Sequence, residues 1–146
     1  MKILNRDALR RFSIEDKITA GIVLTGAEVK SARLGHVDLS GSYVRIKDGE
    51  AEMVGAHISS YKYARDEEFE PKRVRKLLLN KAEITSLRSK TEHSSLTLVP
   101  LALYTIGAFF KVEVGIVRGK KKRDIREDLK KAAQERDIER EVKRYS

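Results

Sequence analysis

The sequence predicts a mainly β protein with short helices, built as an OB-fold-like antiparallel β-barrel with a basic C-terminal tail. With 146 residues, the chain has the length of a single domain. Several short runs rich in β-branched residues alternate with turn residues, which is typical of small barrels. Because charge gathers after residue 117, we expect residues 1–117 to form the barrel with its flanking helices and 118–146 to form the tail.

The first predicted elements are a strand and a short helix. Residues 18–24 are rich in β-branched side chains and end at a turn, which predicts a strand. Residues 27–34 consist mostly of good helix formers. Gly35 follows at the position where a left-handed cap favours a residue without Cβ, so the helix should end there.

A hairpin follows the helix. Residues 42–46 alternate between polar and apolar, and the extended pattern resumes over 51–58. Asp48-Gly49 between them is a strong signal for a two-residue turn. Residues 59–73 are polar without apolar periodicity, which predicts a mobile loop.

The next two predicted elements are a strand over 73–79 and a helix over 81–91. Asn80 can accept a hydrogen bond from an early amide of this helix. Glu83, three residues later, can return a bond to the cap, which is the spacing of a capping box.

The last predicted elements are two long β runs, 96–105 and 108–117, which should pair as a second hairpin. Pro100 lies inside the first run and has no N–H to donate to a ladder. We therefore expect it at a sheet edge or at a bulge.

The tail is polar and strongly charged. Residues 118–146 contain 12 Lys or Arg and 7 Asp or Glu, a net charge of +5. Aliphatic residues are too sparse there to dock a helix firmly on a core. We expect the tail to be disordered alone and to become helical on a polyanion.

Most catalytic and metal chemistry has no support in the residues. The chain has no Cys, which excludes disulfides and thiolate metal sites. His36, His57 and His93 lack metal-ligand spacing, and no phosphate-binding glycine loop occurs. We expect no cofactor and no metal. No apolar run is long enough for a membrane span or a secretory signal, so a cytoplasmic protein without a membrane partner is expected.

One catalytic alternative stays open for testing. Glu28-Val29-Lys30 is a Glu-x-Lys triplet of the kind that, on a strand, can help to hold Mg²⁺ in a nuclease. On the predicted helix, residues i and i+2 point in roughly opposite directions. The two side chains should therefore not converge.

Positive charge is the main functional signal. The chain has 31 Lys and Arg against 22 Asp and Glu, a net charge of +9. Cations gather in two runs, residues 72–76 and 118–123. This pattern indicates a nucleic-acid partner. Tyr61 and Tyr63 could stack on bases or pack on the barrel.

Four blocks of the sequence are similar to a known family. Residues 21–33, 48–51, 73–81 and 111–121 match, in order and spacing, blocks of small protein B (SmpB), the SsrA-binding protein family of bacteria. The first block reads Gly-Ile-Val-Leu-Thr-Gly-Ala-Glu-Val-Lys-Ser-Ala-Arg. The resemblance extends from about Asn5 into the tail.

The resemblance implies an RNA-binding protein rather than an enzyme. It implies an OB-like barrel that binds the tRNA-like domain of transfer-messenger RNA (tmRNA) and acts, with elongation factor Tu and aminoacylated tmRNA, in trans-translation on stalled ribosomes. It implies that the tail lies as a helix in the mRNA channel near the decoding centre and ribosomal RNA. A monomer is expected. The alternative is a general OB-fold ribosome-associated RNA-binding protein or RNA chaperone.

The resemblance also gives candidate residues. Those expected to bind RNA from the barrel are Asn5, Glu28, Lys30, Ser31, Arg33, Arg73, Arg75, Lys76, Leu78 and Lys111. Those expected to act on the ribosome from the start of the tail are Arg118, Gly119, Lys120, Lys121, Lys122, Arg123, Asp124 and Arg126.

Some positions depart from the family pattern. Thr19 stands where many members have Glu, and Arg123 where many have His. Arg10 and Phe12 replace the usual His and Tyr. An Arg guanidinium can also stack on a base, so Arg123 could keep a stacking role.

Overall fold

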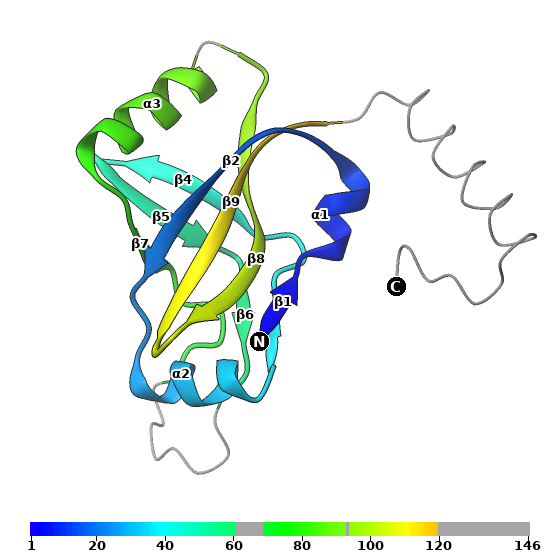
Figure 1. Ribbon diagram of the computed structural model, residues 1–146, viewed down its shortest axis with the longest axis vertical. Helices are drawn as coiled ribbons and strands as arrows, with labels where there is room; N and C mark the ends of the chain where they lie inside the picture. Colours follow the sequence, from blue (N-terminus) through cyan, green and yellow to red (C-terminus); the bar gives the residue numbers. More distant parts are fainter. Residues whose placement is uncertain (61–68, 93, 120–146) are drawn as a thin grey trace, which may run out of the picture.

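The computed structural model describes residues 1–60, 69–92 and 94–119, which are coloured in Figure 1. These residues form a β-barrel with three helices packed around it. The strands in chain order are β1 (Lys2–Leu4), β2 (Phe12–Ile22), β3 (Val37–Asp38), β4 (Tyr43–Lys47), β5 (Glu50–Val54), β6 (His57–Ile58), β7 (Arg75–Leu78), β8 (Thr97–Ile106) and β9 (Phe109–Gly119). The helices are α1 (Arg6–Arg11), α2 (Gly26–Arg33) and α3 (Lys81–Glu92).

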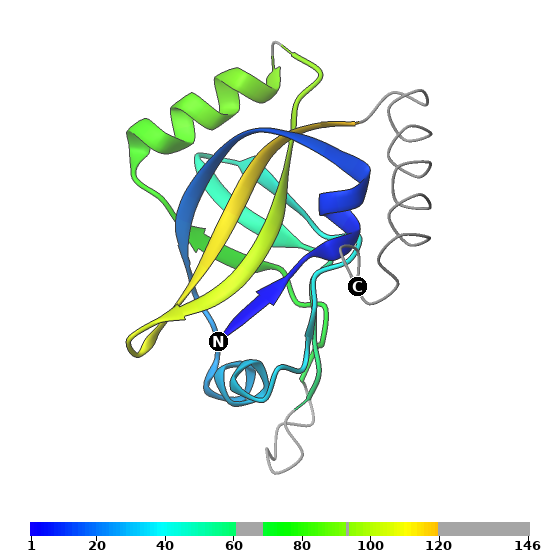
Figure 2. The same cartoon turned by 45° about the vertical axis from the view of Figure 1, so that its right-hand side comes forward.

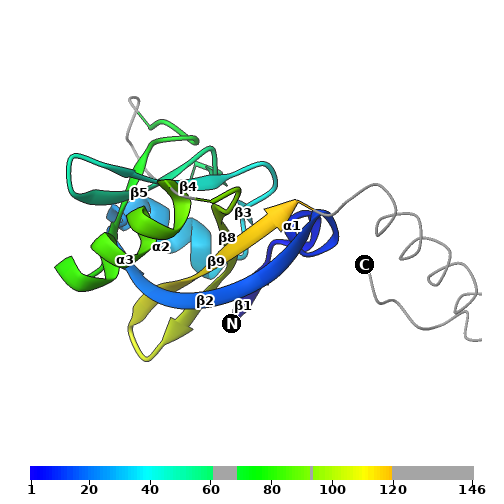
Figure 3. The ribbon, with the colours of Figure 1, turned by 90° about the horizontal axis from the view of Figure 1, so that it is seen from above.

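Strand pairing closes the main sheet on itself. Its order is β1-β8-β4-β5-β7-β2-β9, and all pairs are antiparallel. β9, the last strand in this order, also pairs with β8, so the strands from β8 to β9 in this order form a closed ring. β1 pairs with β8 outside that ring. Figure 3 shows β4 and β5 on one side of the barrel and β2 and β9 on the other. The predicted antiparallel barrel is confirmed.

The second predicted hairpin is confirmed as β8 and β9, with a bulge at the predicted proline. The register shifts between Pro100 and Ala102, and β8 has neighbours on both sides. Pro100 therefore lies at a bulge rather than at an edge. Leu101, inside the bulge, packs on Gly115 so closely that a Cβ there would lie 2.7 Å from the leucine Cδ1.

The first hairpin is confirmed in its turn and corrected in its second arm. Asp48 has φ 51° and Gly49 φ 76°, the two positive values that a type I′ turn requires. The run predicted over 51–58 is not one strand. It breaks at Gly55, with φ 84°, and β6 then pairs with β3 in a separate ribbon.

The first residues form elements that the sequence interpretation missed. β1 pairs with β8, and α1 follows at once. Asn5, which is buried, accepts a bond from the Ala8 N–H and donates to the backbone oxygens of Leu39 and Pro100 at 3.1 and 2.8 Å. This side chain caps α1 and ties it to the barrel. β2 begins at Phe12, six residues before the predicted start at residue 18.

The two longer helices are confirmed, each with its cap. α2 ends before Gly35. This glycine has φ 79°, the left-handed conformation predicted for the residue after the helix. Asn80 and Glu83 exchange side-chain bonds with each other's backbone N–H at 2.8 and 2.9 Å, the predicted capping box of α3. Figures 1 and 2 show α2 at one end of the barrel and α3 at the other.

The barrel ends slightly later in the chain than predicted. β9 continues through Gly119, two residues beyond the predicted end of the barrel at residue 117. The rest of the tail, with its predicted disorder and induced helix, and most of the predicted mobile loop, with Tyr61 and Tyr63, lie outside the described residues. No helix in the described part of the chain is long and apolar enough to cross a membrane.

Candidate nucleic-acid interface

A buried carboxylate lies where α2 meets the barrel. Thr25 caps the helix by accepting a bond from the Glu28 N–H, and Oε1 of Glu28 accepts one from the Thr25 N–H at 2.9 Å. The Thr-x-x-Glu spacing of this capping box is a sequence signal that could have predicted the orientation of Glu28. The helix start thus holds the carboxylate toward β7.

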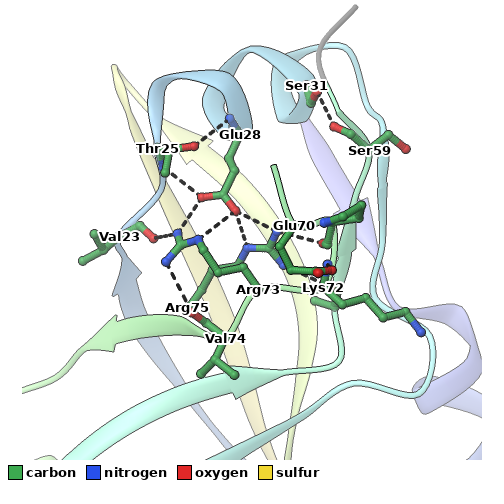
Figure 4. Close-up of polar contacts among 12 residues, drawn as sticks. Val23, Thr25, Glu28, Ser31, Ser59, Glu70, Lys72, Arg73, Val74 and Arg75 are labelled. Atoms are coloured by element: carbon green, nitrogen blue, oxygen red, sulfur yellow. Dashed lines mark hydrogen bonds and ion pairs between the residues drawn. The ribbon is translucent and has the colours of Figure 1, made fainter. Parts of the chain in front are cut away.

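Two arginines from the β7 region meet this carboxylate (Figure 4). Nε of Arg75 donates to Oε2 of Glu28 at 2.7 Å, and Nη2 of Arg73 donates to Oε1 at 2.6 Å. The remaining guanidinium nitrogens of Arg75 donate to the backbone oxygens of Ala56 and Pro71, at 2.7 and 2.9 Å. One side chain thereby joins α2, the chain before β6 and the turn before β7.

The contacts in this cluster favour the ionised form of the Glu28 carboxylate. Burial by itself would raise the pKa of Glu28, but hydrogen bonds from Arg73, from the Thr25 N–H and from Arg75 outweigh it and lower the pKa below its ordinary value. Burial lowers the pKa of Arg75, which Glu28 opposes. Glu28 faces two positive charges, and Glu70 adds a second negative charge close enough to act on Arg75 (Figure 4). Arg73 is the more exposed cation of the cluster.

The α2 candidates divide between the two sides of the helix. Ser31 is buried and donates its hydroxyl to the backbone oxygen of Ser59 at 2.6 Å. Lys30 and Arg33 are exposed. The buried side therefore fixes the helix on the barrel, while the exposed side can meet a partner.

A row of paired residues crosses five strands on the outer face of the barrel. Leu78 of β7 pairs with Gly21 of β2, which pairs with Lys111 of β9. Lys111 pairs with Tyr104 of β8, which pairs with Lys2 of β1. Directly opposed residues share one face of a sheet, so this outer row brings the predicted Leu78 and Lys111 onto a single surface.

The outer row is held together by local contacts. A Cβ on Gly21 would lie 3.1 Å from the Cβ of Leu78, so the leucine packs directly over the glycine. The Lys2 ammonium lies 5.9 Å from the centre of the Tyr104 ring. The Thr19 hydroxyl oxygen lies 3.3 Å from the Tyr104 hydroxyl oxygen, within hydrogen-bond distance. Thr19 thus places a polar group beside the row.

The basic run at 72–76 does not form one continuous cationic face. Alternation along β7 turns Arg75 inward and leaves Lys76 outward. Lys76 pairs with Glu50 at 3.0 Å, and Lys72 is exposed. The run therefore contains one buried cation, Arg75, and surface cations that are partly neutralised. Neighbouring residues of a strand point to opposite faces, which is why Arg75 and Lys76 are separated.

The start of the tail is the second predicted site. Arg118 and Gly119 are exposed at the end of β9. Nε of Arg118 lies 3.4 Å from Oε1 of Glu15, with which it forms an ion pair. The remaining candidates of this site, Lys120, Lys121, Lys122, Arg123, Asp124 and Arg126, lie outside the described residues.

Burial limits what four candidates can do directly. Asn5, Glu28, Ser31 and Arg75 have almost no exposed surface and all bond to other parts of the chain. Their side chains cannot face a ligand in this conformation. Their expected part in RNA binding stays a prediction, and the contacts in the structure hold the elements that carry exposed residues nearby.

The nuclease alternative gains no support from the geometry. Glu28 is buried and bonded to two arginines, while Lys30 is exposed on the helix surface. Among residues 1–60, 69–92 and 94–119, no group of three or more His, Cys, Asp or Glu side chains could hold a metal ion. The two ends of the triplet diverge, as the helical position predicts.

Sequence reasoning missed three members of the outer row. Lys2, Gly21 and Tyr104 become neighbours only through pairing between strands far apart in the chain. Tyr104 lies on a predicted strand, but residues 98–103 before it are apolar without alternation, so the strand pattern gave no signal for its direction.

Comparison with known proteins gives a consistent family match. The family model described as SmpB protein matches residues 2–144. An SsrA-binding protein of Solidesulfovibrio magneticus is 45% identical over 97% of this chain and 92% of the relative. One of Rubrobacter xylanophilus is 45% identical over 95% of this chain and 93% of the relative. A solved structure described as "tmRNA-SmpB: a journey to the center of the bacterial ribosome" is 42% identical, with a TM-score of 0.70 over 83% of this chain and 85% of that chain.

Proposed function

This chain belongs to the SmpB family, and on that premise we propose that it binds tmRNA and acts with it on stalled ribosomes in trans-translation. The barrel binds the tRNA-like domain of tmRNA. Two observations support this function. Relatives named SsrA-binding proteins match nearly the whole chain, and a similar solved structure is described as tmRNA-SmpB.

The observation that supports the binding surface best is the outer row. It places an apolar side chain, Leu78, two cations, Lys2 and Lys111, and an aromatic hydroxyl, Tyr104, on one face. Such a surface can meet phosphates, ribose hydroxyls and base planes without reading a base sequence. A folded RNA of defined shape fits it.

The buried network gives this surface its rigidity. Glu28 and Arg75 fix α2 against the barrel, so that Lys30 and Arg33 keep a constant position relative to the sheet. A preformed surface binds with less loss of conformational freedom than a mobile one. Asn5 does the same for the first helix.

The tail completes the proposal. Residues 118–146 bind in the mRNA channel beside the decoding centre and ribosomal RNA, after delivery of aminoacylated tmRNA with elongation factor Tu. The 12 basic residues of this segment suit such a polyanionic channel. The protein acts by binding, without catalysis, cofactor or metal, as a cytoplasmic monomer.

A salt titration tests the RNA specificity. Binding of the full chain and of a variant ending at Gly119 is measured on a transcript of the tRNA-like domain and on a length-matched unstructured RNA. Both proteins should prefer the tRNA-like transcript at salt concentrations that weaken nonspecific phosphate contacts. Equal binding of the two RNAs would instead indicate a general RNA-binding protein or chaperone.

Tagging of stalled chains tests the tail separately. The variant ending at Gly119 keeps every residue of β9, so its barrel retains all its strand pairs. It should bind the tRNA-like transcript yet fail to support tagging in a reconstituted translation reaction. Normal tagging by this variant would refute the role of the tail.

A further inference from the structure

The turn between β8 and β9 exposes two large apolar side chains. Phe109 is 72% exposed and Ile106 is 55% exposed, and the two residues pair across the hairpin. Gly107 makes the turn with φ 59°. Figure 2 shows this turn projecting from the barrel wall.

The exposed ring lies on the same face as the outer row. Along β9, Phe110 and Val112 are buried, whereas Phe109 and Lys111 are not. Side chains alternate between the two faces of a strand, so Phe109 points outward with Lys111. The ring is therefore one strand period from a cation of the outer row.

Phe109 and Ile106 lie together at the hairpin tip and form an exposed apolar patch. Exposed large apolar side chains that gather in this way mark interaction sites on soluble proteins. The flanking groups are cationic: Lys111 on the same strand, and Lys2 beyond Tyr104. An aromatic face beside cations is the arrangement by which proteins bind unpaired bases together with their phosphates.

We propose that Phe109 stacks on an unpaired base of the bound RNA, with Ile106 supporting the ring from across the hairpin. This inference rests on the proposed function and adds to it a base-binding subsite at the hairpin tip. Base stacking on an aromatic ring tolerates any base, so the subsite selects for an unstacked nucleotide at a fixed place rather than for a sequence.

Affinity measurements test the contribution of the ring. Phe109→Ala should weaken binding of the tRNA-like transcript by roughly 5- to 150-fold. Phe109→Leu should also weaken it, because the substitution keeps apolar bulk and removes the aromatic face. Neither should change the salt dependence, because no cation is lost. Leu9→Ala is the matched control, since Leu9 is an exposed apolar residue on α1.

A fluorescence experiment reports stacking directly. The chain contains no Trp, so Phe109→Trp introduces a single indole at the hairpin tip. The full-length variant should keep the wild-type affinity, and its fluorescence should be quenched as the transcript is added. Leu9→Trp, with its single indole on α1, should show no comparable quenching.

Three results would overturn the proposal while leaving the proposed function intact. These are wild-type affinity of Phe109→Ala, wild-type affinity of Phe109→Leu, and unquenched Phe109→Trp in the complex. The first would show that the ring does not contribute to RNA binding. A wild-type protein that fails to prefer the tRNA-like transcript would refute the proposed function itself, which this series measures in the same titration.

Discussion

Nε of Arg75 donates to Oε2 of Glu28 at 2.7 Å, and the two side chains are 0% and 2% exposed. They come from β7 and α2, separated by 47 residues in the chain. Both ions are removed from water, so each depends on the other for the interactions that water would have supplied. This ion pair fixes α2, with its exposed Lys30 and Arg33, at the end of the barrel.

Arg75→Met should strongly destabilise the protein. The substitution leaves Glu28 buried with only Arg73 as a cationic partner. It also removes the Arg75 donor from the Ala56 oxygen and from the Pro71 oxygen, the second of which still accepts from the Ile58 N–H. Removing one partner of a buried pair costs about 3 to 5 kcal/mol. Urea unfolding followed by circular dichroism should show a loss in this range.

Lys76→Met is the matched control for this substitution. Lys76 is the next residue of β7 and pairs with Glu50 on the surface. Exposed pairs contribute about 0 to 1 kcal/mol. A loss in Arg75→Met no larger than in this control would contradict the assigned role of the buried pair.

The Glu28 carboxylate should also make stability depend on pH. Its pKa in the folded protein is lowered from the ordinary value of 4.5, so the folded state favours the ionised form. The resulting stabilisation is present above the unfolded pKa and is lost as pH falls through the folded pKa. Unfolding in urea across this acidic range should show a smaller pH dependence for Glu28→Gln than for the wild type. Equal slopes would mean that Glu28 does not contribute.

The β8 bulge makes Gly115 a packing position. An added Cβ would lie 2.7 and 2.8 Å from two carbon atoms of Leu101, which is buried. Overpacking of this kind costs about 1 to 3 kcal/mol. Gly115→Ala should therefore lower the melting temperature. Gly26→Ala, where nothing lies within 4 Å, should leave it unchanged or raise it slightly, and a similar fall in both variants would count against the bulge contact.

Local sequence signals predicted the elements whose chemistry is local. The Asp48-Gly49 turn, the Asn80–Glu83 cap and the Gly35 helix end each depend on residues a few positions apart, and each is present. The break at Gly55 was missed, because a lone glycine in an extended run does not show whether the strand continues or turns to another sheet.

Long-range relationships could not be predicted in this way. Nothing near Asn5 in the sequence indicates that its side chain is buried. It donates to the backbone oxygens of Leu39 and Pro100, which are 34 and 95 residues away in the chain. Arg75 lies in a cationic run that suggests a solvated surface, and only the period of β7 turns it inward. For the candidate site, the family resemblance gave Leu78 and Lys111, whereas their alignment with Tyr104 follows from strand pairing alone.

Lys111→Ala should change the salt dependence of RNA binding more than the fold. Lys111 lies on the outer row between Gly21 and Tyr104, and the proposed RNA surface predicts that it contacts a phosphate. Losing one phosphate contact reduces the slope of log affinity against log salt by about 1. Lys90→Ala, which removes an exposed lysine near the far end of α3, should keep the wild-type slope. The salt slope depends on the number of phosphate contacts and not on base stacking. It therefore distinguishes the effect of losing Lys111 from the effect of losing the Phe109 ring on the same surface. An unchanged slope in Lys111→Ala would place the phosphates elsewhere on the barrel.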